Sequence, residues 1–102
     1  MSDARVKTGT YVGTGAAVNI ALGFQPAAFI VWNETDGDAL WIWADGMAAG
    51  TAIAIAAAVA AQGSNGVTKY DGAEGVTAKG ITVGTALSES GKTHRYIAFR
   101  GD

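Results

Sequence analysis

Short apolar runs separated by glycine follow one another along the whole chain. The sequence holds 15 Gly and one Pro in 102 residues, and these turn residues divide runs rich in β-branched and aromatic side chains at intervals of about eight to twelve residues. This spacing is typical of an all-β protein. It predicts strands at residues 7–12, 18–22, 28–33, 39–44, 67–70, 81–83 and 95–100. We expect an antiparallel β-sandwich or jelly-roll-like single domain, residues 9–102, preceded by a polar arm, residues 1–8.

The alanine-rich segment at residues 47–61, MAAGTAIAIAAAVAA, admits two interpretations. Alanine is the best helix former, but Ile53 and Ile55 recur with the period of two that is typical of a strand. The pattern favours strand structure over residues 51–59, with a short helix as the alternative. Its small side chains suit the close approach of a second sheet or a second subunit. The run is shorter than the roughly 20 residues of a membrane-spanning helix, and we expect no membrane segment.

Polar and glycine-rich stretches predict the connections between these strands. The sequence QGSNG, residues 62–66, predicts a loop, and DGAEG, residues 71–75, and SESG, residues 88–91, predict turns. No linker divides the chain.

All three tryptophans, Trp32, Trp41 and Trp43, lie in two apolar runs, AAFIVWNE and ALWIWAD, which are joined by TDGD. The dipeptide Asp36-Gly37 supplies the positive φ that a hairpin turn needs, so the sequence predicts a β-hairpin.

Both faces of this hairpin are apolar. Alternation places Phe29 and Val31 on one face of the first strand and Ile30 and Trp32 on the other, and in the second strand the two tryptophans oppose Leu40 and Ile42. A strand with one solvated face should carry polar residues there. The tryptophans either fill the core of one subunit, or one face fills the core and the other is covered by a partner.

Charge and cysteine content exclude several classes of function. Seven basic residues are scattered among nine acidic ones, giving a net charge of -2, so we expect no nucleic-acid partner. The absence of cysteine excludes disulfides and thiol catalysis. The first ten residues hold no apolar signal segment, which predicts synthesis in a cytoplasm without export by that route.

Few residues carry a pattern associated with chemistry. His94 lies near Ser88 and Glu89 but outside any recognisable nucleophile motif, and we expect a half-exposed strand residue and no enzyme. The acidic side chains in and after the hairpin loop do not match a calcium-binding loop, and we expect solvated turn carboxylates with no cofactor or metal. This acidic set is Glu34, Asp36, Asp38 and Asp45. The last three residues, RGD, are interpreted as a chance tripeptide.

Several glycine-rich β motifs resemble those of small bacteriophage virion proteins and tail-tip modules. The order is G-x-Y-x-G-x-G, an L-G-F-x-P strand entry, a G-[FI]-T-V-G strand, an S-G turn and Y-x-A-F. In this chain these motifs are Gly9, Tyr11, Gly13 and Gly15; Leu22, Gly23, Phe24 and Pro26; residues 80–84; Ser90 and Gly91; and Tyr96, Ala98 and Phe99. The resemblance covers most of the chain except the alanine-rich segment.

The resemblance implies a virion β-sandwich protein that is commonly trimeric. Because the chain has neither heptads nor a repetitive stem, we expect a capsid decoration, or cement, protein that binds the major capsid protein on the capsid exterior as a homotrimer. The alternative is a tail-fibre tip module that binds a host receptor or a carbohydrate. The candidate interface residues are Phe24, Pro26, Trp32, Trp41 and Trp43.

Overall fold

The computed structural model describes residues 6–37, 39–70 and 79–100, and these form an all-β domain. Their strands are β1 (Val6–Val12), β2 (Val18–Ala21), β3 (Pro26–Asn33), β4 (Leu40–Ala44), β5 (Thr51–Ile55), β6 (Val59–Tyr70), β7 (Gly80–Val83) and β8 (Thr93–Arg100), with one 3₁₀ helix, η2 (Thr85–Leu87). The predicted antiparallel all-β single domain is confirmed. The turn predicted at residues 71–75 lies outside the described residues.

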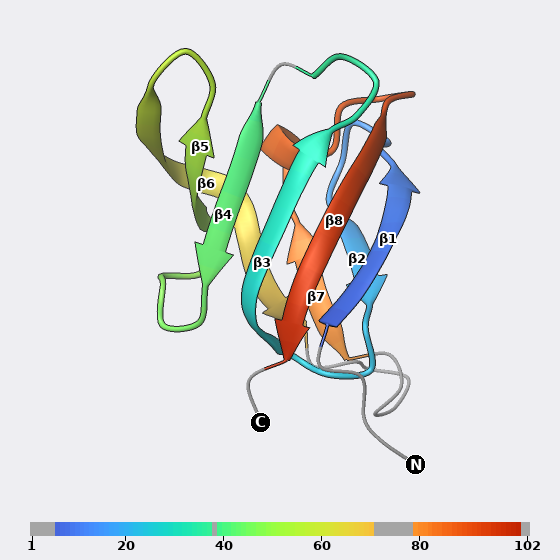
Figure 1. The fold of residues 1–102 in the computed structure, drawn as a ribbon, viewed down its shortest axis with the longest axis vertical. Coiled ribbons are helices and arrows are strands. Elements are labelled where there is room, and N and C mark those ends of the chain that lie inside the picture. Colours follow the sequence, from blue (N-terminus) through green and yellow to red (C-terminus); the bar gives the residue numbers. More distant parts are fainter. Residues whose placement is uncertain (1–5, 38, 71–78, 101–102) are drawn as a thin grey trace.

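All the described strands belong to one antiparallel sheet, in the order β1-β8-β3-β4-β5-β6-β7-β2. The sheet curls so that β1, β8, β3 and β4 form a front layer and β6, β7 and β2 lie behind it (Figure 1). The two layers of the expected sandwich are therefore made by one continuous sheet. Within the described part of the chain, no helix has the length and apolar character needed to cross a membrane.

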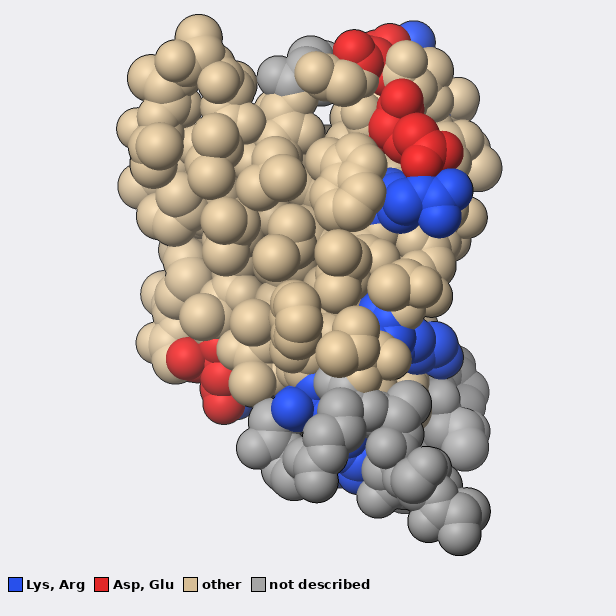
Figure 2. Space-filling model, in the orientation of Figure 1, with Lys and Arg blue, Asp and Glu red and all other residues tan. Residues whose placement is uncertain are grey.

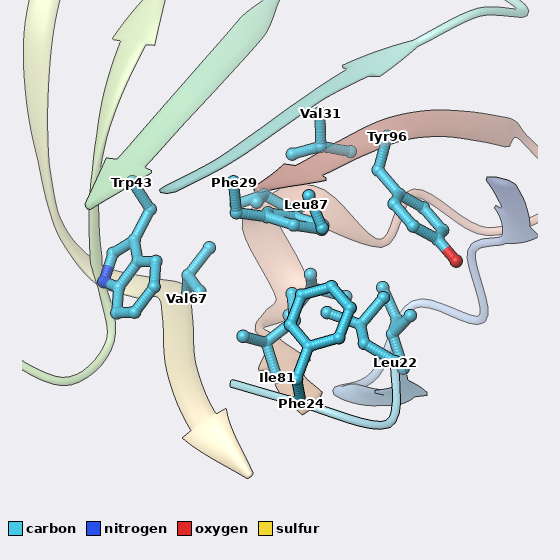
Figure 3. Close-up of a cluster of buried hydrophobic side chains, with 12 residues drawn as sticks. Leu22, Phe24, Phe29, Val31, Trp43, Val67, Ile81, Leu87 and Tyr96 are labelled. Atoms are coloured by element: carbon cyan, nitrogen blue, oxygen red, sulfur yellow. The ribbon is translucent and has the colours of Figure 1, made fainter. Parts of the chain in front are cut away.

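The hydrophobic core lies between these two layers. Phe29 and Val31 of β3 and Ala98 of β8 are fully buried from the front, and Ile81 and Val83 of β7 are fully buried from behind. Figure 3 shows these layers meeting around a packed cluster. Other members of the cluster are Ile20, Leu22, Phe24, Trp43, Val67, Leu87 and Tyr96. Period-two alternation along each strand supplies this core, because every second side chain points inward.

The predicted tryptophan hairpin is present as β3 and β4, with Trp32 opposite Leu40 in the register. The connection between the two strands is longer than the predicted turn, because strand pairing ends at Trp32 and Leu40. The Asn33 carbonyl accepts a hydrogen bond from the Gly37 N–H at 2.7 Å, and Gly37 has a φ of 65°. The dipeptide Asp36-Gly37 thus supplies the expected positive φ inside a wider loop.

The alanine-rich segment forms a second hairpin, and its strand interpretation is correct for Thr51–Ile55. The prediction of a single strand over residues 51–59 missed a bend at residues 56–58, after which β6 begins at Val59. The loop predicted at residues 62–66 is wrong, since β6 runs through it. The register shifts there from Ala52 opposite Gln62 to Thr51 opposite Val67. The polar residues that indicated a loop lie at this irregularity, between the two pairing registers.

The sheet extends into the predicted N-terminal arm. β1 begins at Val6, which pairs with Phe99 of β8. Residues 6–8 of the predicted arm are therefore strand residues, because they pair with Phe99, Ala98 and Ile97 of β8.

Candidate interaction surface

A row of four isoleucines crosses the outer side of the front layer, opposite to the core. Ile30 of β3 pairs with Ile97 of β8 on one side and with Ile42 of β4 on the other, and Ile42 pairs in turn with Ile53 of β5. Directly paired residues point to the same side of a sheet. All four side chains are partly exposed. We call this set the isoleucine row.

A second row runs parallel to the first, one pair further along the strands. Trp32 pairs with Leu40 on β4 and with Arg95 on β8, and Leu40 pairs with Ile55 on β5. A shallow cavity of about 250 Å³ opens in this row, lined by Trp32, Gly37, Ala39, Leu40, Ile55 and Ala56. The isoleucine row together with Trp32, Leu40, Ile55 and the exposed Phe99 is termed the outer apolar face.

Charged groups lie around the outer apolar face and not within it. Figure 2, drawn from the same side as Figure 1, shows an uncharged surface in the middle, with acidic and basic side chains near the upper right and lower edges. Three ion pairs are formed by Glu34 with Arg95, Asp36 with Lys92 at 3.2 Å, and Asp45 with Lys69 at 2.6 Å. An apolar centre with a charged rim is the usual composition of a protein interaction surface.

These ion pairs account for the described part of the predicted acidic set. The hydrogen bond from Arg95 lowers the pKa of Glu34, and the hydrogen bond from Lys69 lowers the pKa of Asp45. Hydrogen bonds with the side chains of Glu89 and Lys92 lower the pKa of Asp36. Among the described residues, no group of three or more potential ligands could hold a metal ion.

The three tryptophans have different environments. Trp43 has 1% of its surface exposed and lies in the core, and Trp41 is half-buried against that core. The indole nitrogens of both are buried and have no hydrogen-bond partner within the described chain. Trp32 lies on the outer apolar face. The predicted division of the hairpin into an inner and an outer side is therefore present, with Trp32 alone of the three on the outer side.

Two other candidate interface residues are also internal. Phe24 has 7% of its surface exposed and belongs to the core cluster, and Pro26 is fully buried at the start of β3. This corrects their placement at an interface: the segment between β2 and β3 turns inward, where Phe24 closes the lower part of the core in Figure 3. The sequence had shown an apolar strand entry without showing which way it faces.

His94 is buried, so the prediction of a half-exposed residue is wrong. It has 1% of its surface exposed, and its ring stacks on Tyr11 of β1 with centroids 5.0 Å apart. His94 Nε2 accepts a hydrogen bond from the Glu89 N–H at 3.2 Å, and the Oγ of buried Ser88 accepts one from the Thr14 N–H at 3.0 Å. These contacts attach the segment after η2 to β8 and to the residues after β1.

Tyr11 closes the same end of the domain. Its hydroxyl donates a hydrogen bond to the Leu87 carbonyl at 2.7 Å, and burial raises the pKa of this hydroxyl. The geometry assigns a packing role to Tyr11, Ser88 and His94, since the Tyr11–Leu87, Thr14–Ser88 and Tyr11–His94 contacts each join distant segments of the chain.

The isoleucine row was only partly anticipated from the sequence. Alternation separated Ile30 from Phe29 and Val31, and Ile42 from the two tryptophans of its strand, without showing which face is outward. Ile53 and Ile97 were not linked to them. The available signal was the alternation within each strand; combining the four strands requires their spatial order and register.

Comparisons with protein-family models, curated proteins and solved structures return no match to this chain.

Proposed function

We propose that this chain is a structural protein of a bacteriophage virion that decorates the capsid exterior and binds the major capsid protein through its outer apolar face. The observation that carries the proposal is the isoleucine row with its charged rim. A solvated sheet face would carry polar side chains at these positions. Burying the row against a partner gains free energy at about 25 cal/mol per Å² of apolar area.

The assignment to a virion comes from the resemblance of the glycine-rich motifs, which also implies a homotrimer. In such an assembly the role is mechanical. Several modest contacts made by one oligomer to a repetitive shell give slow dissociation, because each contact holds the others close to their sites. A net charge of -2 fits a position outside the shell, where the protein does not meet the packaged genome.

Quantitative mass spectrometry of purified particles tests this role. A decoration protein is expected in hundreds of copies, whereas a tail-fibre tip is present in only a handful. Absence from the particle would refute both virion roles.

The binding surface is tested with purified heads that lack the protein. We expect Ile30→Asp to abolish head binding while the domain remains folded, because a carboxylate in the isoleucine row would be desolvated on docking. Thr10→Asp is the matched control, since Thr10 is exposed on β1. Equal binding by both variants would contradict the assignment of the outer apolar face.

A tail-fibre tip that binds carbohydrate is the second candidate, and the cavity beside Trp32 favours it. An indole ring can stack on a sugar, and the nearby Glu34 and Arg95 side chains can exchange hydrogen bonds with hydroxyl groups. This function predicts saturable quenching of tryptophan fluorescence by host surface glycans, lost in Trp32→Ala. No quenching by any glycan fraction from a sensitive host would exclude it.

A further inference from the structure

An asparagine followed by a glycine lies in β6 where its register with β5 shifts. Asn65 has a φ of 59° and is the only residue other than glycine with a positive φ in the described parts of the chain. Asparagine tolerates this conformation better than most residues. At the next position a Cβ would lie 2.7 Å from the carbonyl carbon of Thr51, so Gly66 has no room for a side chain. The backbone therefore favours asparagine at one position and requires glycine at the next.

An Asn-Gly pair has an intrinsic chemical reactivity. The backbone nitrogen of the glycine loses its proton to a base in the solvent and attacks the Cγ of the asparagine side chain. The new N–Cγ bond closes a succinimide ring, the bond from Cγ to the amide nitrogen breaks, and ammonia leaves. Water then opens the ring at either carbonyl and gives aspartate or isoaspartate. Glycine favours ring closure because it has no side chain to obstruct the approach of its nitrogen.

Asn65 differs from the other two asparagines in its environment. Its side chain is exposed and is followed by a glycine. Asn33 is buried, donates a hydrogen bond to Asp36 Oδ2 at 3.2 Å and accepts one from the Asp36 N–H at 2.9 Å. Asn19 precedes the β-branched Ile20. The chemistry therefore selects Asn65 among the three.

The fold holds the attacking nitrogen away from this reaction. The Gly66 N–H donates a hydrogen bond to the Gly50 carbonyl at 2.8 Å, and the Gly66 carbonyl accepts one from the Gly84 N–H at 2.7 Å. Gly66 is buried, and a Cβ at Gly84 would lie 2.4 Å from the Asn65 carbonyl carbon. The peptide between Asn65 and Gly66 is thus held on both sides. Its nitrogen reaches the side-chain Cγ only after the hydrogen bond to Gly50 breaks.

This hydrogen bond closes the base of the alanine-rich hairpin formed by β5 and the start of β6. Gly50 directly precedes β5, and its N–H donates in turn to the Val67 carbonyl at 2.9 Å. The hairpin lies at the side of the molecule farthest from β1 (Figure 1), and residues 56–61 at its tip are all exposed. A segment with few buried apolar contacts opens at a lower free-energy cost than the core strands.

We propose that Asn65-Gly66 is a self-modification site, at which deamidation is blocked while this hairpin is closed and proceeds when it opens. Isoaspartate adds a methylene to the main chain, so Gly66 no longer matches its partners Gly50 and Gly84 at the same time. Either product also adds a negative charge to residues 47–68, which contain no charged side chain. The modified hairpin is therefore expected to open more readily than the original one. This inference does not depend on the proposed virion role.

Incubation of the purified protein at mildly alkaline pH, with and without denaturing guanidinium chloride, tests the site. Trypsin releases residues 8–69 as one peptide, because no Lys or Arg lies between Lys7 and Lys69, so mass spectrometry compares all three asparagines in one fragment. In denaturant we expect Asn65 to deamidate before Asn19 and Asn33. In the folded protein we expect the Asn65 rate to fall at least about tenfold. No preference for Asn65 in denaturant, or equal rates in both conditions, would overturn the proposal.

Hydrogen exchange measures the opening independently. The opening that frees the Gly66 nitrogen also exposes its N–H to exchange, and the open population sets both rates when opening is fast relative to the chemistry. We expect the protection factor of the Gly66 amide and the slowing of deamidation to agree within about a factor of five. A larger disagreement in either direction would overturn the control of this reaction by hairpin opening.

Asn65→Asp is the matched control for the effect of the product, because it adds the charge without the extra methylene. We expect amides of residues 51–62 to exchange faster in the isoaspartyl form, isolated by anion exchange, than in Asn65→Asp. Equal exchange in the two forms would contradict the proposed effect of the longer backbone on the hairpin.

Discussion

Replacement of Trp43 by alanine tests whether the hairpin's inner face holds the fold together. Trp43 is 1% exposed, so nearly its whole side chain is removed from water. A buried aromatic side chain of this size covers about 200 Å², which at about 25 cal/mol per Å² corresponds to about 5 kcal/mol. Because alanine retains part of this area, we expect Trp43→Ala to lower the free energy of unfolding by about 3–5 kcal/mol.

That loss is large relative to the whole stability of a small domain, which is about 5–15 kcal/mol. Urea unfolding followed by far-ultraviolet circular dichroism measures it, with the slope against urea concentration checked for constancy. The melting temperature should fall by about 12 °C or more. Trp32→Ala is the control on the outer side of the same hairpin, and we expect it to cost less, about 1–2 kcal/mol, because that side chain is partly exposed to solvent.

Trp43→Phe separates packing from hydrogen bonding. The Trp43 indole N–H is buried without a partner in the described chain, and a buried unsatisfied donor costs about 1–3 kcal/mol. Phenylalanine removes this donor and keeps most of the apolar volume, so the two effects offset and we expect a change within about 1 kcal/mol. A Trp43→Ala variant as stable as the wild type would refute the core placement, and a Trp43→Phe variant as unstable as Trp43→Ala would refute the offset.

The remaining predictions concern backbone packing and pH. A Cβ at Gly80 would lie 1.9 Å from the Ile20 carbonyl oxygen, so we expect Gly80→Ala to separate β2 from β7 and to lower the free energy of unfolding, measured in urea, by about 3 kcal/mol or more. Gly63→Ala is the control, because a Cβ there meets no atom within 4 Å, and we expect it to change the free energy of unfolding by about 0.5 kcal/mol or less. Because the hydrogen bond from Arg95 lowers the folded-state pKa of Glu34, its stabilisation is present at neutral pH and is lost as pH falls below about 4.5. Thermal unfolding between about pH 6 and pH 3 should therefore show a smaller loss of melting temperature in Glu34→Gln than in the wild type; an equal loss would contradict this ion pair.

Local alternation made the strands and their faces predictable. Phe29 and Val31 were assigned to one face and Ile30 and Trp32 to the other from the sequence, and the structure places the first pair in the core and the second outside. This succeeds because side-chain direction in a strand depends only on position within that strand.

Long-range features were less predictable. His94 lies in a strand whose neighbours in sequence are polar, and its burial depends on Tyr11 in β1, more than eighty residues earlier. Residues 62–66 have loop composition, but β6 continues through them, since the neighbouring strands supply partners on both sides of the shift. The burial of His94 depends on a distant segment, and the continuation of β6 depends on its register with the adjacent strands; local propensity encodes neither.

The composition of the outer face changes from one strand to the next, and this change bears on its role. On β1, Thr8 lies opposite Ile97 and Thr10 lies opposite Arg95, so both threonines are on the same side of the sheet as the isoleucine row. Threonine favours strands about as well as isoleucine does and leaves a hydroxyl for water. The fold therefore accepts a polar β-former on this face, and strand formation alone does not require isoleucine at four consecutive paired positions. The step from threonine on β1 to isoleucine on β8 and beyond marks the boundary at which we expect contact with a partner to begin.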